Sequence, residues 1–185
     1  AIGDLNNDGY DDLVIAHQHN GTHTDLTAFI YYGSAEGLTE RYKIELPAPN
    51  CRAVTIGDFN GDGLKDIAFA SDGKLSIFYQ QANGFHAGNF KDYDLEATHL
   101  SAGDIDGDGI DDLYVRVRKD VPRILWGSPA GINLNDITIV GHQDESAKVF
   151  PSTTPGWDLF AEGWMPKILR LNGNIYLFRD RKSVV

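Results

Sequence analysis

The chain has 185 residues, of which 42% are hydrophobic and 23% are charged, a composition that allows a buried core and excludes an intrinsically disordered chain. No apolar run approaches the roughly 20 residues of a membrane-spanning helix, so we expect no membrane insertion. The formal net charge of −11 disfavours nucleic acid as a partner.

The negative charge is concentrated in three places. Twelve of the 27 acidic residues fall in three short windows, and the rest of the chain is close to electrically neutral. Three divalent cations would reduce the net charge from −11 to about −5, an ordinary value for a soluble domain. The single cysteine, Cys51, cannot form an internal disulfide, and we predict that it is a small buried hydrophobe.

An internal repeat runs through the first part of the chain. The segments that begin near Asp4, Asp58 and Asp104 align without gaps, and each reads D-x-[DN]-x-D-G-x-x-D between two short apolar runs. An aromatic-rich run, a turn and a further run with strand character follow each copy. Four strands in a repeat of about 50 residues are typical of a β-propeller blade. We therefore predict an all-β fold, a partial β-propeller of three to four four-stranded blades, with strands A to D in each.

The predicted blades follow one another along a single propeller fragment, 1–185. Blade one spans about 1–48, blade two about 52–95 and blade three about 98–141. The remaining segment, about 155–185, lacks the acidic motif but contains Asn172-Gly173 between two apolar runs, a strong hairpin signal. We interpret it as a degenerate fourth blade.

The acidic loop between strands A and B offers oxygen atoms at alternate positions. Calcium binds six to eight oxygens from carboxylates, amides, backbone carbonyls and water. Loop positions 1, 3, 5 and 9 supply side-chain oxygens, position 7 supplies a carbonyl, and the glycine at position 6 permits a sharp turn. We predict three Ca²⁺ sites, formed by Asp4, Asn6, Asp8, Tyr10 and Asp12; by Asp58, Asn60, Asp62, Leu64 and Asp66; and by Asp104, Asp106, Asp108, Ile110 and Asp112. The apolar residue at position 2 is expected to pack into the core.

Other metal sites fit the loop less well. An EF-hand needs Glu at position 12, where this chain has Ile15, Phe69 and Val115. Magnesium prefers a rigid octahedral site that keeps several waters, and no His or Cys accompanies the loops to favour zinc. Asp-Gly turns that bind nothing remain the alternative, which three copies in the same context disfavour.

These motifs resemble the FG-GAP or VCBS repeats of the integrin α-subunit propeller and its bacterial relatives, over about residues 1–140. The resemblance implies a seven-bladed propeller with calcium in the A-to-B loops of one face and ligands met on the opposite face. It also implies adhesion, carbohydrate recognition, or a place beside extracellular polysaccharide-degrading enzymes. Since three to four blades would leave an open arc, we expect either a longer chain or a second copy to complete the ring.

The opposite face has three candidate ligand-binding groups. The B-to-C loop of blade one contains His17, His19 and His23, which either bind a transition metal or are solvated loop residues. The candidates in the other blades are Arg116, Arg118 and Arg123, and Trp157 and Trp164. The arginines suit an acidic sugar or carboxylate but also an exposed hairpin, and the tryptophans either stack on sugars or are buried.

No catalytic motif is found, and we predict no catalytic residues. The sequence favours a calcium-binding module for adhesion or for glycan or protein recognition, with calcium in a structural role. We expect it to be extracellular, secreted or at the cell surface, with the periplasm as the alternative. Two other functions stay open: an accessory or catalytic propeller of a polysaccharide-degrading enzyme such as a lyase, and an architectural subunit of a surface filament or fibre.

Overall fold

The computed structural model of the chain describes residues 1–19, 21–23 and 25–139. Over these residues the fold is all-β apart from one 3-10 turn, η1 (Glu40–Tyr42). No helix among them is long and apolar enough to cross a membrane. The predicted fourth blade, with Trp157 and Trp164, lies outside the described residues.

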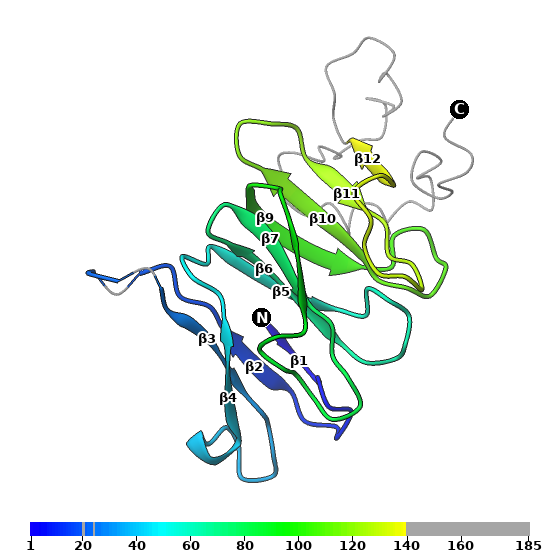
Figure 1. The fold of residues 1–185 in the computed structure, drawn as a ribbon. Helices are drawn as coiled ribbons and strands as arrows, with labels where there is room; N and C mark the ends of the chain where they lie inside the picture. The colour runs from blue at the N-terminus through cyan, green and yellow to red at the C-terminus, as the bar shows by residue number, and fades with distance from the viewer. Residues whose placement is uncertain (20, 24, 140–185) are drawn as a thin grey trace, which may run out of the picture.

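Twelve strands form three four-stranded antiparallel sheets, one for each copy of the repeat (Figure 1). The first sheet contains β1 (Ile2–Gly3), β2 (Asp12–Ile15), β3 (Thr27–Tyr31) and β4 (Lys43–Pro47). The second contains β5 (Ala53–Gly57), β6 (Asp66–Ser71), β7 (Lys74–Phe78) and β8 (Phe90–Tyr93). The third contains β9 (Ala97–Gly103), β10 (Asp112–Val117), β11 (Arg123–Leu125) and β12 (Ile137–Ile139). Strands pair in chain order within each sheet, which confirms the all-β fold and its four-stranded blades. Ring closure and the total number of blades stay predictions.

The second sheet lies between the first and the third (Figure 1). Its strand β6 is buried along its whole length, because a neighbouring sheet covers each of its faces. The corresponding strand of the first sheet, β2, alternates between buried and more exposed residues. A strand with one covered face shows this alternation, whereas a strand covered on both faces reads as a continuous apolar run. The burial patterns of β2 and β6 therefore agree with the place of the second sheet between the other two.

Two hydrophobic cores fill the spaces between the sheets. The first contains Leu5 and residues of the first and second sheets, and the other contains Phe59 and residues of the second and third. Both side chains are fully buried, which confirms the prediction for loop position 2 in these two copies. The third copy has Ile105 at this position, and it is half-buried. Each of the first two loops thus contributes an apolar wedge to the core shared with the sheet that follows.

Cys51 lies in the core between the first and second sheets, as predicted for a small buried hydrophobe. Its Sγ donates a hydrogen bond of 3.2 Å to the carbonyl of Ala53. Burial raises the pKa of the Cys51 thiol to about 11, so the thiolate is scarce at neutral pH.

Candidate metal centres

The three acidic loops share a set of internal hydrogen bonds. In the first loop, Asp4 Oδ1 accepts the N–H of Asp8 at 3.2 Å and Asp4 Oδ2 accepts the N–H of Gly9 at 2.9 Å. The carboxylates of Asp58 and Asp104 accept the equivalent N–H groups. The three loops also agree at position 5, where Oδ1 of the aspartate accepts the backbone N–H of the residue two positions later. The local sequence therefore produces one loop geometry three times.

Backbone conformation explains how the nine residues of each loop turn around one centre. The glycine at position 6 has a left-handed φ of +88°, +85° or +90° in the three copies. Position 4 is left-handed too, with φ of +59° at Asn7, +70° at Gly61 and +80° at Gly107. Asparagine and glycine are the residues that adopt this conformation most readily. Asparagine or glycine at position 4 is visible in the sequence, but our prediction of the turn used only the glycine at position 6.

The third loop has carboxylates at positions 1, 3 and 5. Oxygen atoms of Asp104, Asp106 and Asp108 lie within 4.8 Å of one another. Like charges about 4 Å apart repel by roughly 1 to 4 kcal/mol at the effective dielectrics of water and a protein surface. The first two loops have asparagine at position 3, so their oxygen donors carry less charge. Sets of hard oxygen donors that converge in this way suit a divalent cation.

The aspartate at position 9 has a different environment from the other predicted ligands. In the first loop, Asp12 is fully buried, with Oδ2 accepting the N–H of Leu5 at 2.7 Å and Oδ1 accepting the N–H of Gly33 at 2.7 Å. The equivalent carboxylates, Asp66 and Asp112, each accept two backbone N–H groups in the same way. Position 9 thus ties the loop to the end of strand C. Whether it also binds a cation stays a prediction, as do the carbonyl ligands at position 7.

Burial changes the protonation of this aspartate. It raises the pKa of Asp66 to about 7, although two backbone hydrogen bonds favour the ionised form, and it also raises the pKa of Asp12. Nearby loop carboxylates act in the same direction. A cation bound in the loop would oppose both effects by stabilising the negative charge.

The second and third loops are joined directly. Asp111, at position 8, receives a hydrogen bond of 2.9 Å from the N–H of Asp58 and an ion pair of 2.9 Å from Lys65 Nζ. Its own N–H donates to the Asp58 carbonyl at 2.8 Å. We made no prediction for Asp111, because its partners lie about fifty residues earlier and no local pattern indicates the pairing.

Comparison with known proteins supports this description of the loops. The family model for the FG-GAP-like repeat matches residues 4–69 and 58–115. The chain belongs to this family. Each FG-GAP match begins at the first aspartate of one loop and runs through the next loop into the strand that follows. The family's blade architecture and the three sheets of the structure therefore agree.

Two curated relatives of this FG-GAP chain are integrin α subunits of Drosophila melanogaster. Integrin alpha-PS5 and integrin alpha-PS3 are each 28% identical to the chain over 93 residues, which is 44% of the chain. The matched part is 9% of the first relative and 8% of the second. The chain thus spans less than a tenth of these proteins.

The three histidines predicted as a ligand-binding group have separate contacts. Nδ1 of His17 lies 2.9 Å from the carbonyl oxygen of Thr27, and His19 Nδ1 accepts the N–H of Gly21 at 3.2 Å. His23 Nδ1 lies 3.8 Å from Asp25. Within the described ranges these side chains are not grouped as metal ligands, whereas the three aspartates of the third loop are. The ligand role of the histidines stays a prediction.

The predicted arginines lie in and beside an open pocket of about 720 Å³ in the FG-GAP chain. Its lining includes His99, Arg116 and Arg118. Arg118 already pairs with Glu96 at 2.8 Å, and Arg123, outside the lining, pairs with Asp120. The structure thus brings two of the predicted residues together, and one of these two has its charge neutralised.

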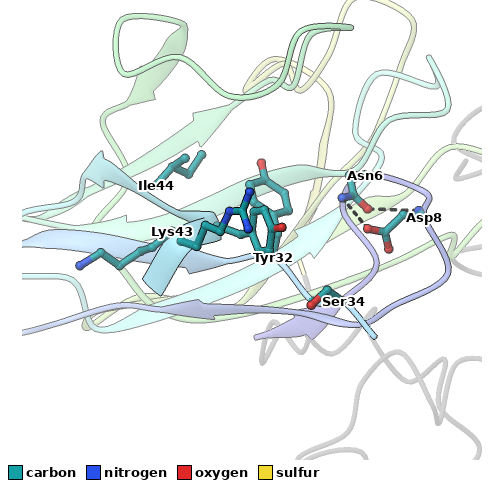
Figure 2. A pocket seen from close by; sticks show the side chains of 9 residues that line it. Asn6, Asp8, Tyr32, Ser34, Lys43 and Ile44 are labelled. Atoms are coloured by element: carbon teal, nitrogen blue, oxygen red, sulfur yellow. Dashed lines mark hydrogen bonds between the residues drawn. The ribbon is translucent and has the colours of Figure 1, made fainter. Parts of the chain in front are cut away.

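A second pocket, of about 400 Å³, opens beside the first acidic loop (Figure 2). Figure 2 shows Asn6 and Asp8 of this loop facing the side on which Tyr32 lies. The guanidinium of Arg41 lies 5.3 Å from the centre of the Tyr42 ring at the edge of the pocket. Sequence reasoning did not find this pocket, because residues 41–44 meet the loop only when the sheet has folded.

Proposed function

We propose that the chain is a calcium-binding extracellular propeller module for adhesion or for recognition of a glycan or protein, with calcium in a structural role. The observation that carries the proposal is the threefold repetition of one loop geometry, together with the convergence of the carboxylate oxygens at positions 1, 3 and 5 of the third loop. Membership of the FG-GAP-like family and the similarity to integrin α subunits support an adhesion role.

Calcium fits these loops better than other common metals. All side-chain donors at positions 1, 3 and 5 are oxygens, as a hard cation requires, and zinc would prefer nitrogen or sulfur. These donors are half-buried or exposed side chains on short loops, which suits the variable coordination number of calcium more than the strict octahedron of magnesium. Extracellular modules bind calcium in the 10⁻⁴ to 10⁻³ M range, which matches the concentration outside cells.

The connections of the loops support a structural role for the cation. Each loop begins at the end of strand A, contributes its position-2 residue to a core or partly buried contact, and ends at a buried aspartate. Charge repulsion in an empty loop therefore acts at the junction of two sheets. A bound cation would remove the repulsion and stabilise the row of sheets by mass action.

The cation proposal is tested with a triple variant, Asp8→Asn, Asp62→Asn and Asp108→Asn. It removes one carboxylate charge per loop and keeps the side-chain volume. Asp25→Asn, Asp72→Asn and Asp94→Asn together form the control, because they change the charge equally at exposed positions outside the loops. We expect calorimetry to show a higher melting temperature in calcium than in EGTA for the parent and the control, and a much smaller difference for the triple variant. Equal melting temperatures of the parent in both buffers would contradict the proposal.

The recognition role is tested separately with glycan arrays, uronic-acid polymers and immobilised extracellular matrix proteins. Saturable binding without turnover supports the module. Release of sugar products would favour the enzymatic alternative, and absence of both would favour an architectural subunit.

A further inference from the structure

The second sheet contains a tyrosine that the following repeat covers. The hydroxyl of Tyr79 accepts the N–H of Ile132 at 3.0 Å and lies 3.2 Å from the hydroxyl of Tyr93. The turn at Gly131 comes so close that a Cβ there would lie 2.5 Å from the Tyr79 hydroxyl. Contacts from the third repeat therefore occupy the space around this hydroxyl.

The equivalent tyrosine of the first sheet, Tyr32, is not covered in this way. Tyr32 and Tyr79 each follow the last residue of strand C, β3 in the first sheet and β7 in the second. A Cβ at Gly84, the equivalent of Gly131, would meet nothing within 4 Å, so this turn makes no such contact with Tyr32. The Tyr32 hydroxyl has no hydrogen-bond partner among the residues that the structure describes, and its side chain lines the pocket of about 400 Å³. Burial raises the pKa of Tyr32 to about 12, so the hydroxyl keeps its proton at neutral pH and can donate it to a ligand.

Arg41 supplies a positive charge at this pocket. Its guanidinium lies 5.3 Å from the centre of the Tyr42 ring, and no carboxylate in the described part of the chain forms an ion pair with it. Lys43 differs, because its Nζ lies 3.1 Å from Glu40 and 3.5 Å from Glu45. Figure 2 shows the Lys43 side chain directed away from the acidic loop. The charge open to a ligand is therefore that of Arg41, beside an aromatic ring.

These groups match the chemistry of a sugar that carries a carboxylate. A guanidinium binds a carboxylate through two parallel hydrogen bonds. The rings of Tyr32 and Tyr42 offer apolar surface to a sugar ring, and the Tyr32 hydroxyl offers a donor to its oxygen atoms. The volume of about 400 Å³ lies in the range of small-molecule sites. The carboxylate of an acidic peptide would use the guanidinium alone, so the two tyrosines favour a sugar.

We propose that this pocket binds a uronic acid unit of an acidic glycan, with Arg41 as the residue that binds the carboxylate. The inference rests on the proposed recognition of a glycan, and it names the class of glycan and the place. That place is the end of the first sheet with the acidic loop, whereas Arg116 and Arg118 lie at the opposite end of the third sheet. Asp8 is the acidic side chain of the lining, and its charge opposes an anion. Because a cation in the first loop would offset this charge, binding is measured in calcium.

The experiment is a calorimetric titration with short oligomers of galacturonate and of glucuronate. Their methyl esters, which have the same rings without the charge, are the control ligands. The parent should bind at least one acidic oligomer and bind its ester about tenfold or more weakly, because hydrogen bonds to charged groups are the stronger ones. Arg41→Gln should weaken binding of the acidic oligomer by about tenfold or more, and Tyr32→Phe, which removes only the hydroxyl, by about two- to tenfold. Arg52→Gln is the matched control, because it removes the same charge at an exposed position outside the pocket, and it should bind like the parent.

The outcomes separate this inference from the proposed function. Binding of a neutral glycan or a protein by the parent, without binding of any uronate oligomer, would keep the recognition role and overturn the inference. An unchanged affinity for uronate oligomers in folded Arg41→Gln or Tyr32→Phe would also overturn it, as circular dichroism of each variant makes clear. Loss of binding in Arg116→Gln, with Arg41→Gln unchanged, would place the acidic sugar at the pocket of the third sheet instead.

Discussion

The side chain of Gln80 donates a hydrogen bond of 2.7 Å from Nε2 to the carbonyl of Leu5, a residue of the preceding repeat. Gln80 is 5% exposed, and the same nitrogen also donates to the carbonyl of Lys65 at 3.1 Å. One amide group therefore joins the first loop to the second sheet.

Replacement of Gln80 by alanine should destabilise the protein. The change removes the donor from two carbonyls and opens a cavity between two sheets. Loss of a partner for a buried polar group costs about 1 to 3 kcal/mol. Gln81→Ala is the matched control, because the Gln81 side chain is exposed, and it should change the unfolding free energy by less than about 0.5 kcal/mol. Equal losses for the two variants, measured by denaturant titration, would show that the hydrogen bonds to Gln80 contribute little.

Asp66 and Asp62 should respond differently to removal of the cation. Asp66→Ala leaves two buried N–H groups, of Phe59 and Gln80, without an acceptor, so we expect a loss of roughly 2 to 6 kcal/mol both in calcium and in EGTA. Asp62→Ala removes an exposed carboxylate that we propose as a cation ligand, so most of its cost should appear in calcium and vanish in EGTA. Thermal melts of the two variants in both buffers make this comparison. An Asp66→Ala loss that disappears in EGTA would assign that residue to the cation rather than to the sheet.

The metal-free protein should lose stability as the pH rises toward neutrality. The pKa of Asp66 is about 7 in the folded chain and 3.8 in its ordinary state, so the folded state binds the proton more tightly. The unfolding free energy contributed by this group is therefore highest below about pH 4, falls as the pH rises, and levels off above about pH 7. The raised pKa of Asp12 acts with the same sign.

The variant Asp66→Asn isolates the contribution of the Asp66 carboxyl group, because asparagine has nearly the same shape and does not titrate. The difference in unfolding free energy between the parent and Asp66→Asn, measured in EGTA across this pH range, should shift in favour of the variant as the pH rises. Parallel profiles would contradict the assignment. Saturating calcium should reduce the dependence of the unfolding free energy on pH, since a bound cation favours the ionised carboxylate.

Gly131→Ala should cost more than Gly84→Ala, although both residues occupy the same turn of their repeats with positive φ. A Cβ at Gly131 would lie 2.5 Å from the hydroxyl of Tyr79, whereas a Cβ at Gly84 would meet nothing within 4 Å. The Tyr79 hydroxyl cannot move freely, since it accepts the N–H of Ile132 at 3.0 Å. Left-handed strain of about 1 to 2 kcal/mol is common to both variants. The difference between their melting temperatures therefore reports the contact with Tyr79, and equal values would show that the ring can shift.

The sequence was sufficient to predict the strands, the three acidic loops and the burial of Leu5 and Phe59. These features depend on local patterns, namely apolar alternation, glycine at position 6 and the spacing of the aspartates. It was not sufficient to predict the environment of Asp12, because one of its two hydrogen-bond donors, Gly33, lies about twenty residues later, just beyond the end of β3. The contact of Asp111 with Lys65 was missed for the same reason. Pairs of this kind become visible only when strands of one sheet, as for Asp12 and Gly33, or two neighbouring sheets, as for Lys65 and Asp111, are placed side by side.

Because the apolar residue at loop position 2 packs against the next sheet, a sequence repeat and a hydrophobic core do not end at the same residue. Leu5 is part of the first repeat in the chain but completes a core with the second sheet. A gene rearrangement that removed residues 58–103 would bring Leu5 next to Leu113 and Val115, which already pack against the equivalent wedge, Phe59. Loss or duplication of a whole repeat therefore preserves the type of contact at the new junction. Families of this architecture can change their number of repeats by recombination without designing a new interface at each step.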